Sequence, residues 1–242
     1  MEKLTKKQRK ELKKFEWQEK LKSQKRNEML KKIAIWAGAA LLLILSVWGL
    51  IALSSSSPDQ QNSSTRIPQV SKEDIKIGSE SARITLVEYS DFQCPACAAY
   101  HPMVNQLISE FEGRMLFVYR FFPIQSHQNA MISAQSSLAA HKQGKFFEMY
   151  NLLFDNQNSW VNSSNAEKIF VEYAGKLNLD IDKFKSDLKK DETKNLINNQ
   201  YSQAIAIGVN STPTFFLNGV KIQNPRTYDD FKNLIQNELN KK

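Results

Sequence analysis

A run of strand-forming residues that leads into a closely spaced cysteine pair constrains the fold of this chain more than any other feature. Residues 84–89 (Ile-Thr-Leu-Val-Glu-Tyr) are mostly β-branched or aromatic, and Cys94-Pro95-Ala96-Cys97 follows four residues later. Pro95 suits the first position of a helix, where its missing N–H group costs nothing, and apolar residues then recur at helical spacing as far as Phe111. We therefore expect a strand that ends just before the cysteines and a helix that begins at them.

The pattern after this junction predicts a mixed α/β domain. Residues 115–121 form a second strand, parallel to the first if the helix is a crossover, and Asn218-Gly219 favours a type I′ hairpin between strands at 214–217 and 220–222. Helical spacing predicts the remaining elements, at 130–142, 146–154, 166–177, 181–188, 193–206 and 228–239. The order β-α-β, helical block, β-β-α is that of a thioredoxin fold with a helical insertion at about residues 127–207.

An uncharged stretch of 21 residues, Ile33–Leu53, precedes this domain. A helix of this length spans roughly 31 Å, which matches the hydrocarbon thickness of a bilayer. Thirteen Lys and Arg residues precede the stretch, whereas only Arg66 lies in the first 18 residues after it, so the positive-inside rule places the N-terminus in the cytoplasm. The alternative is a cleaved secretory signal, but the 32-residue leader and the long apolar run favour a retained anchor.

These features divide the chain into four predicted segments. We expect a basic cytoplasmic leader at residues 1–32, a single transmembrane helix at 33–53, a flexible Ser-rich linker at 54–66 and an extracytoplasmic domain at 67–242. The leader carries 13 Lys or Arg against 5 Asp or Glu, whereas the remaining 210 residues hold 20 of each. Because the positive charge is confined to the leader, composition predicts contact with a membrane bilayer and argues against a nucleic-acid-binding domain.

The chain has two cysteines, and in an exported domain three roles compete for them. A structural disulfide would gain little stability, because its loop has only two intervening residues. A zinc site would need two further ligands, of which only His101 lies nearby in the sequence, so we expect no metal. A redox centre fits best, because the start of a helix stabilises a thiolate at Cys94 and places Cys97 one turn further on.

This placement predicts a role for each sulfur. Cys94 is the expected nucleophile and Cys97 the resolving thiol. A substrate thiolate attacks the Cys94–Cys97 disulfide at Cys94, and a second substrate thiol then displaces Cys94, so that a disulfide passes to the substrate. The chain then needs no cofactor beyond this redox-active disulfide, but an electron acceptor must reoxidise its dithiol.

Two segments resemble the DsbA-like thiol-disulfide oxidoreductases of the thioredoxin superfamily. The first is Tyr89-Ser90-Asp91-Phe92-Gln93-Cys94-Pro95-Ala96-Cys97, and the second is Val209-Asn210-Ser211-Thr212-Pro213-Thr214-Phe215-Phe216. The resemblance covers about residues 67–242. It implies an enzyme that introduces disulfide bonds into reduced exported proteins and is reoxidised by a quinone-coupled membrane protein of the DsbB or vitamin K epoxide reductase type.

The resemblance also implies two further parts of the site. The Thr212–Pro213 bond is expected to be cis, to face Cys94 and to lie where an extended substrate peptide binds. A carboxylate is expected beneath the cysteines, six residues before the first one, where Glu88 stands on the strand face that alternation marks as buried. Glu88 would shuttle a proton to or from Cys97, and the alternative is a solvated or ion-paired glutamate.

Three residues close to the pair are candidates for tuning its redox properties. Pro95 and Ala96 separate the cysteines and include no histidine to add positive charge beside the thiolate, so a strongly oxidising potential does not follow from the sequence. His101 shares a helical face with both cysteines, and its alternative is a packed helix histidine.

Three other functions remain open at this stage. The first is a disulfide reductase or isomerase, because Thr before Pro213 resembles isomerases as much as oxidases, although no dimerisation domain is evident. The second is a redox-independent tethered chaperone or binding module, and the third is a metal chaperone. Disulfide donation on the outer face of a cell membrane is the function that we expect.

Overall fold

A five-stranded mixed sheet forms the centre of the part of the chain that the structure describes. The computed structural model describes residues 67–241 and, before them, only Trp17, Lys20, Lys22, Met29, Gly38 and Leu41. The predicted leader, transmembrane helix and linker therefore lie outside the described residues, apart from those six. Among the residues described, no helix has the length and apolar character needed to cross a bilayer. The sheet belongs to the unit Asn62–Lys242, one of two into which the chain divides.

The strands lie in the order β1-β3-β2-β4-β5 across the sheet. Their bounds are Ile75–Gly78 (β1), Ile84–Ser90 (β2), Met115–Phe121 (β3), Thr214–Leu217 (β4) and Val220–Lys221 (β5). Strands β2 and β3 are parallel, which confirms the predicted crossover, and the other neighbouring pairs are antiparallel. Asn218 and Gly219 have φ angles of 49° and 82°, the positive values of a type I′ turn, so the β4–β5 hairpin is also confirmed.

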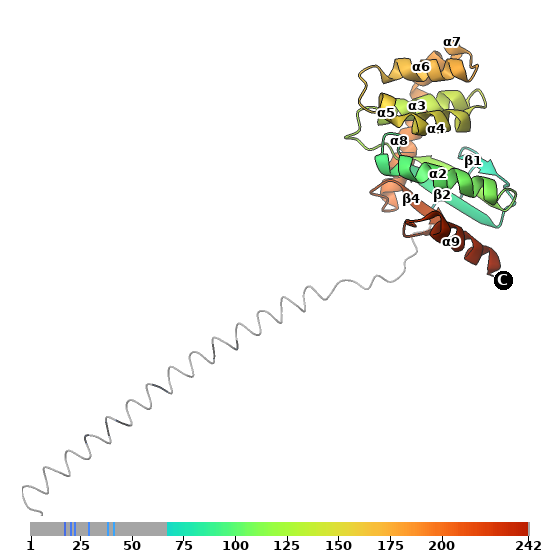
Figure 1. Ribbon diagram of the computed structural model, residues 1–242. Coiled ribbons are helices and arrows are strands. Elements are labelled where there is room, and N and C mark those ends of the chain that lie inside the picture. The colour runs from blue at the N-terminus through green and yellow to red at the C-terminus, as the bar shows by residue number, and fades with distance from the viewer. Residues whose placement is uncertain are drawn as a thin grey trace, which may run out of the picture. The chain divides into compact units, whose positions relative to one another are not determined.

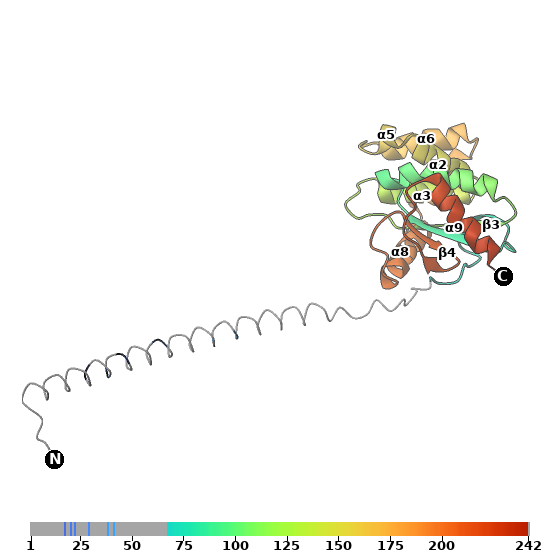
Figure 2. The ribbon, with the colours of Figure 1, turned by 60° about the horizontal axis from the view of Figure 1, so that its bottom comes forward.

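The helices cover the sheet and build the insertion. They are α2 (Pro95–Glu110), α3 (Ala130–His141), α4 (Phe146–Asp155), α5 (Gln157–Trp160), α6 (Ala166–Lys176), α7 (Ile181–Lys189), α8 (Asp191–Ala206) and α9 (Tyr228–Asn240). Every helix predicted within residues 67–241 is present with ends that differ by at most two residues, whereas β1 and α5 were not predicted. Helices α3 to α7 gather at the end of the domain away from α9 (Figures 1 and 2).

Alternation along the strands divides the apolar core into two parts. Leu86 and Phe117 belong to the larger part, which α2, α9 and the insertion complete. Val87 and Val118, the next residues along the same strands, belong to a smaller part that includes residues of α8. The sheet is therefore covered on both faces, with α2, α9 and helices α3 to α7 on the face that also carries Glu88 and residues of α8 on the other.

A buried ion pair attaches β1 to the edge of the sheet. Arg120 of β3 donates from Nε and Nη2 to the two carboxylate oxygens of Asp74, each at 2.9 Å, and from Nη1 to the Tyr89 hydroxyl at 2.9 Å. Its Nη2 also donates to the Pro68 carbonyl at 3.2 Å. Only Ile75 of β1 is buried, so the strand itself contributes little apolar area. The polar contacts of Arg120 therefore position the segment that precedes β1.

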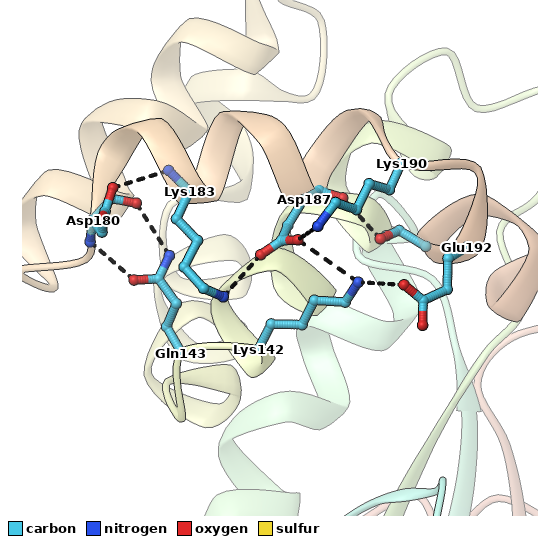
Figure 3. A network of polar contacts seen from close by, with 8 residues as sticks. Lys142, Gln143, Asp180, Lys183, Asp187, Lys190 and Glu192 are labelled. Carbon is cyan, nitrogen blue, oxygen red and sulfur yellow. Dashed lines mark hydrogen bonds and ion pairs between the residues drawn. The ribbon is translucent and has the colours of Figure 1, made fainter.

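A second buried carboxylate joins three helices of the insertion (Figure 3). Asp187 of α7 lies 2.6 Å from Lys190 Nζ, 3.1 Å from Lys183 Nζ and 3.8 Å from Nζ of Lys142, which is the C-cap residue of α3. Lys142 also pairs with Glu192 of α8 at 2.9 Å. Burial opposes ionisation of the carboxyl, but hydrogen bonds from Lys190 and Lys183 outweigh it and lower the pKa of Asp187.

We expect Asp187→Asn to destabilise the domain at neutral pH. The asparagine keeps the size of the side chain and loses the charge, and because the Lys183 and Lys190 side chains are about half exposed, solvent screening limits the cost to about 1–2 kcal/mol. A carboxyl whose folded pKa is lowered stabilises the fold above its unfolded pKa of about 4, and this contribution is lost as the pH falls through the folded value. Urea unfolding should show a smaller difference between variant and wild type at pH 3 than at pH 7, and an equal difference at both would contradict the ionic origin.

Candidate active site

The cysteine pair lies at the junction of β2 and α2, as the sequence predicts. Cys94 is the N-cap residue of α2, with extended φ and ψ angles of −71° and 122°, and Cys97 lies in the first turn. Both are free thiols and both are buried, Cys94 being 6% and Cys97 1% exposed. Pro95 and Ala96 between them are exposed at the surface.

The two sulfurs lie in opposite electrostatic environments. A hydrogen bond from the Cys97 thiol and others from the backbone amides of Cys97 and Ala96 lower the pKa of Cys94 to about 5, against the effect of burial. Burial, the Cys94 sulfur and the charge of Glu88 raise the pKa of Cys97 well above its usual value. Cys94 is therefore a thiolate at neutral pH and Cys97 a neutral thiol that donates to it.

Glu88 lies within the core beside the pair. Its side chain is 1% exposed, and in the register of the sheet it stands opposite Tyr119 of β3 and Phe215 of β4. Burial raises the pKa of Glu88 to about 7, and the Cys94 charge adds to the rise. Its Oε2 atom has no hydrogen-bond partner among the described residues, and the same is true of the hydroxyls of Tyr119 and Tyr150 nearby. Glu88 is thus a buried acid that can hold or release a proton near neutral pH.

The loop before β4 faces Cys94. The Thr212–Pro213 peptide bond is cis, and the Cys94 sulfur lies 3.5 Å from the Thr212 carbonyl oxygen, to which it donates only in its protonated form. Asn224 donates from Nδ2 to the Pro213 carbonyl at 2.7 Å, which fixes the loop from the side of the segment that leads to α9. The structure therefore brings Thr212 and Pro213, 118 residues after Cys94, to the redox pair.

The contacts given for His101 are with residues of α2 and α4 and not with the cysteine sulfurs. Its Nε2 is 2.9 Å from both Asn105 Nδ2 and Asn151 Oδ1, and its Nδ1 is 3.5 Å from Asp155 Oδ1. Its ring packs on Tyr150 of α4, with ring centres 5.0 Å apart. These contacts are those of a packed helix histidine that joins α2 to α4.

The sequence pattern missed a buried aspartate that shapes the loop before Cys94. Asp91 accepts from the amide of Gln93 at 2.8 Å and of Ile124 at 3.0 Å, and its Oδ2 lies 2.6 Å from His127 Nδ1. Its backbone carbonyl accepts from the Cys94 amide at 3.0 Å. The Asp91 side chain thus ties the cysteine loop to the segment after β3. The sequence signal that could have found Asp91 is the tendency of an Asp side chain to accept from the amide two residues later, here Gln93. No sequence pattern predicts the contact between Asp91 and His127.

The part of the chain that the structure describes contains no group of three or more His, Cys, Asp or Glu side chains that could hold a metal ion.

Comparison with known proteins agrees with this geometry. A sequence profile of the Thioredoxin family matches residues 70–237. The chain belongs to this family. Its domain is similar to α-DsbA1 from Wolbachia pipientis, with 25% identity and a TM-score of 0.63 over 71% of this chain and 92% of that one. It is similar in fold to oxidised BdbD from Bacillus subtilis, with 20% identity and a TM-score of 0.64 over 72% and 97% of the two chains. The chain is accordingly a DsbA-like oxidoreductase with a thioredoxin fold.

The curated relatives are longer proteins that are named as sodium/proton antiporters. The Na(+)/H(+) antiporter NhaA 1 of Mycolicibacterium vanbaalenii is 30% identical over 199 residues, which are 80% of this chain and 31% of the antiporter. The protein of the same name from Mycobacterium sp. strain KMS is 31% identical over 80% of this chain and 32% of its own length. The DsbA-like chain therefore spans about a third of the length of these relatives.

We expect the reduced protein to show one thiolate titration with a midpoint near pH 5. The thiolate absorbs at 240 nm, so a pH titration of the full-length chain in detergent measures it directly. Cys97→Ala removes the first of the hydrogen bonds that stabilise the thiolate and should move the midpoint upward by about one pH unit. Cys94→Ser should abolish the transition near pH 5, and its survival in that variant would show that another group titrates there.

Proposed function

We propose that this protein introduces disulfide bonds into exported proteins, with the Cys94–Cys97 disulfide as the oxidant. The observation that carries the proposal is the asymmetry of the pair, in which one sulfur is stabilised as a thiolate and the other is buried as a neutral thiol. Stabilising the reduced form makes a dithiol pair give up its disulfide more readily.

The proposed reaction has two exchange steps. A substrate thiolate attacks Cys94 in the oxidised enzyme, an S–S bond forms between substrate and Cys94, and the bond to Cys97 breaks. Cys97 leaves as a thiolate and takes a proton. A second substrate thiolate then attacks the substrate sulfur of the mixed disulfide, and Cys94 leaves as the stabilised thiolate. Two substrate thiols become one disulfide, and the enzyme disulfide becomes a dithiol.

Glu88 is the proposed source of the proton for Cys97. Both groups are 1% exposed, so the Cys97 thiolate cannot take its proton from bulk water directly. A substantial fraction of Glu88 is protonated near pH 7 and can donate, because its pKa is about 7. In the reverse direction, when a partner reoxidises the enzyme, the ionised Glu88 accepts the Cys97 proton.

The Thr212–Pro213 loop is the proposed binding site for the substrate backbone. Thr212 is partly exposed, and its carbonyl already contacts the Cys94 sulfur. An extended substrate that pairs with the backbone at Thr212 would place its own sulfur against Cys94. We assign Pro95 and Ala96 to the surface that the substrate approaches, and His101 to packing.

The proposed location is the outer face of a cell membrane, with the N-terminus in the cytoplasm. The uncharged stretch Ile33–Leu53 and the 13 Lys and Arg residues before it support a single-pass anchor. The dithiol left by each cycle needs an electron acceptor, and a quinone-coupled membrane protein of the DsbB or vitamin K epoxide reductase type is the proposed partner.

The surface gives less support to a redox-independent chaperone. Within residues 67–241 the exposed large apolar side chains are Ile77, Ile205 and Val220, which come from three different elements or their ends. A surface that binds unfolded chains would expose a larger contiguous apolar patch.

We expect the full-length chain to have a reduction potential nearer to that of a strong oxidant than to that of thioredoxin. Equilibration with glutathione buffers and alkylation of free thiols measure it. A value near about −120 mV would support disulfide donation, and one near about −270 mV would contradict it in favour of a reductase. Oxidation of a reduced client protein should be lost in Cys94→Ser with Cys97→Ser, whereas a chaperone would keep its activity.

The proton role of Glu88 predicts a pH dependence. The rate of the first exchange step, divided by the fraction of substrate thiolate, should fall as the pH rises through about 7, because the acid form of Glu88 is lost. Glu88→Gln should flatten this profile and slow the step about 100-fold at pH 6. Glu112→Gln is the matched control, since Glu112 is exposed and should leave the profile unchanged. A Glu88→Gln profile that still falls near pH 7 would exclude Glu88 as the donor.

A further inference from the structure

A side-chain amide of the insertion holds the backbone of the cysteine loop. Gln157 lies at the start of α5, and its side chain is buried. Its Nε2 donates to the Phe92 carbonyl at 2.7 Å and to the Cys94 carbonyl at 3.1 Å. One amide nitrogen thus binds the two carbonyls that flank Gln93.

A second amide contact fixes Gln93 itself. The Gln93 side chain accepts from the backbone N–H of Asn129 at 2.6 Å and donates to the Val161 carbonyl at 3.0 Å. Asn129 donates from Nδ2 to the carbonyls of Trp160 and Ser163, each at 3.0 Å, which holds the segment after α5. The segment that carries Gln157 is therefore itself anchored and can act as a rigid support for the loop.

We propose that Gln157 is a positioning residue of the redox centre, which fixes the backbone at Cys94 so that its sulfur stays aimed at the donors that stabilise its thiolate. The proposal rests on the proposed function, because it assigns Gln157 a part in setting how readily the pair gives up its disulfide.

The need for such a support follows from the position of Cys94. It is the N-cap of α2 and has no side-chain cap of its own, because its side chain is the reactive group. Its orientation therefore depends on its backbone, whose amide donates to the Asp91 carbonyl at 3.0 Å and whose carbonyl accepts from Ala98 at 3.1 Å and from Gln157. A rotation at Cys94 would move its sulfur away from the amides of the first helical turn.

The chemistry of an amide suits this place. The two carbonyls need two N–H donors from one direction, which a primary amide provides without charge. A carboxylate there could not donate and would add negative charge close to the Cys94 thiolate. An apolar side chain of the same length would leave the Phe92 carbonyl, buried beside it, without this donor.

The test compares Gln157→Met with Gln135→Met in the full-length chain. Gln135 donates from Nε2 to the Leu188 carbonyl at 2.9 Å, so it makes the same kind of bond within the insertion but away from the cysteines. Both variants should lower the melting temperature, Gln157→Met by more because it loses two hydrogen bonds and Gln135→Met loses one. We expect only Gln157→Met to raise the midpoint of the 240 nm thiolate titration, by about one pH unit, and to weaken disulfide donation to glutathione about tenfold. Gln157→Glu should raise the midpoint further.

Each other outcome overturns the proposal. Gln157 is a structural residue only if Gln157→Met changes the melting temperature but leaves the ionisation constant of the Cys94 thiol within about twofold of the wild-type value. The same conclusion holds if neither Gln157 variant folds and Gln135→Met does. The thiolate titration requires no disulfide exchange, so it tests Gln157 separately from the proposed function. Wild-type protein that titrates near pH 5 but transfers no disulfide would contradict the proposed function. The midpoint shift in Gln157→Met would still decide whether Gln157 positions Cys94.

Discussion

The stabilisation of one thiolate at the start of α2 is the interaction on which the arrangement of this domain depends. Four separate parts of the chain meet at Cys94. Asp91 directly follows strand β2 and shapes the loop before Cys94, and α2 supplies the amides. The loop before β4 supplies the Thr212 carbonyl, and the insertion supplies Gln157. The Thr212 contact requires the sheet in its observed order, because that order places β4 beside β2.

Burial acts on the neighbouring groups in the opposite sense. It raises the pKa values of both Cys97 and Glu88, whereas directed hydrogen bonds overcome it at Cys94. The difference lies in donors, since the helix start points its amides at the first sulfur and not at the second. One buried region thus holds a thiolate at Cys94, a neutral thiol at Cys97 and a weak acid at Glu88. Three groups with separated ionisation ranges are what a cycle of thiol exchange and proton transfer uses.

Much of the fold was predictable from local pattern, and the failures have physical reasons. Strand β2, helix α2 and the β4–β5 hairpin follow from residue types and turn chemistry at known spacing. Strand β1 was missed because only Ile75 of its four residues is buried, and the segment before it is held by Arg120, 46 residues away from Asp74. Helix α5 has four residues, too few for a periodic signal.

The site divides in the same way. Cys94 and Cys97 were predicted from their spacing at a strand–helix junction, while Glu88 and the Thr212–Pro213 bond came from family resemblance. The contact of His127 with Asp91 and that of Gln157 with Cys94 were not predicted, because they join residues 36 and 63 positions apart through single side chains. Sequence pattern therefore identified the reacting atoms and missed the residues that hold them in place.

The pairing of β2 with β4 has a consequence for the order in which the molecule is assembled. A chain made from its N-terminus presents Cys94 and Cys97 early, and Thr212 appears 118 residues later. Until then the central strand has an open edge, and closing it requires contacts over the whole length of the insertion, which form slowly because of their sequence separation. During synthesis the two thiols are therefore exposed to other cysteine-containing chains before their own protein shields them. The unfinished protein therefore carries two accessible thiols, as do the reduced proteins that we propose it oxidises.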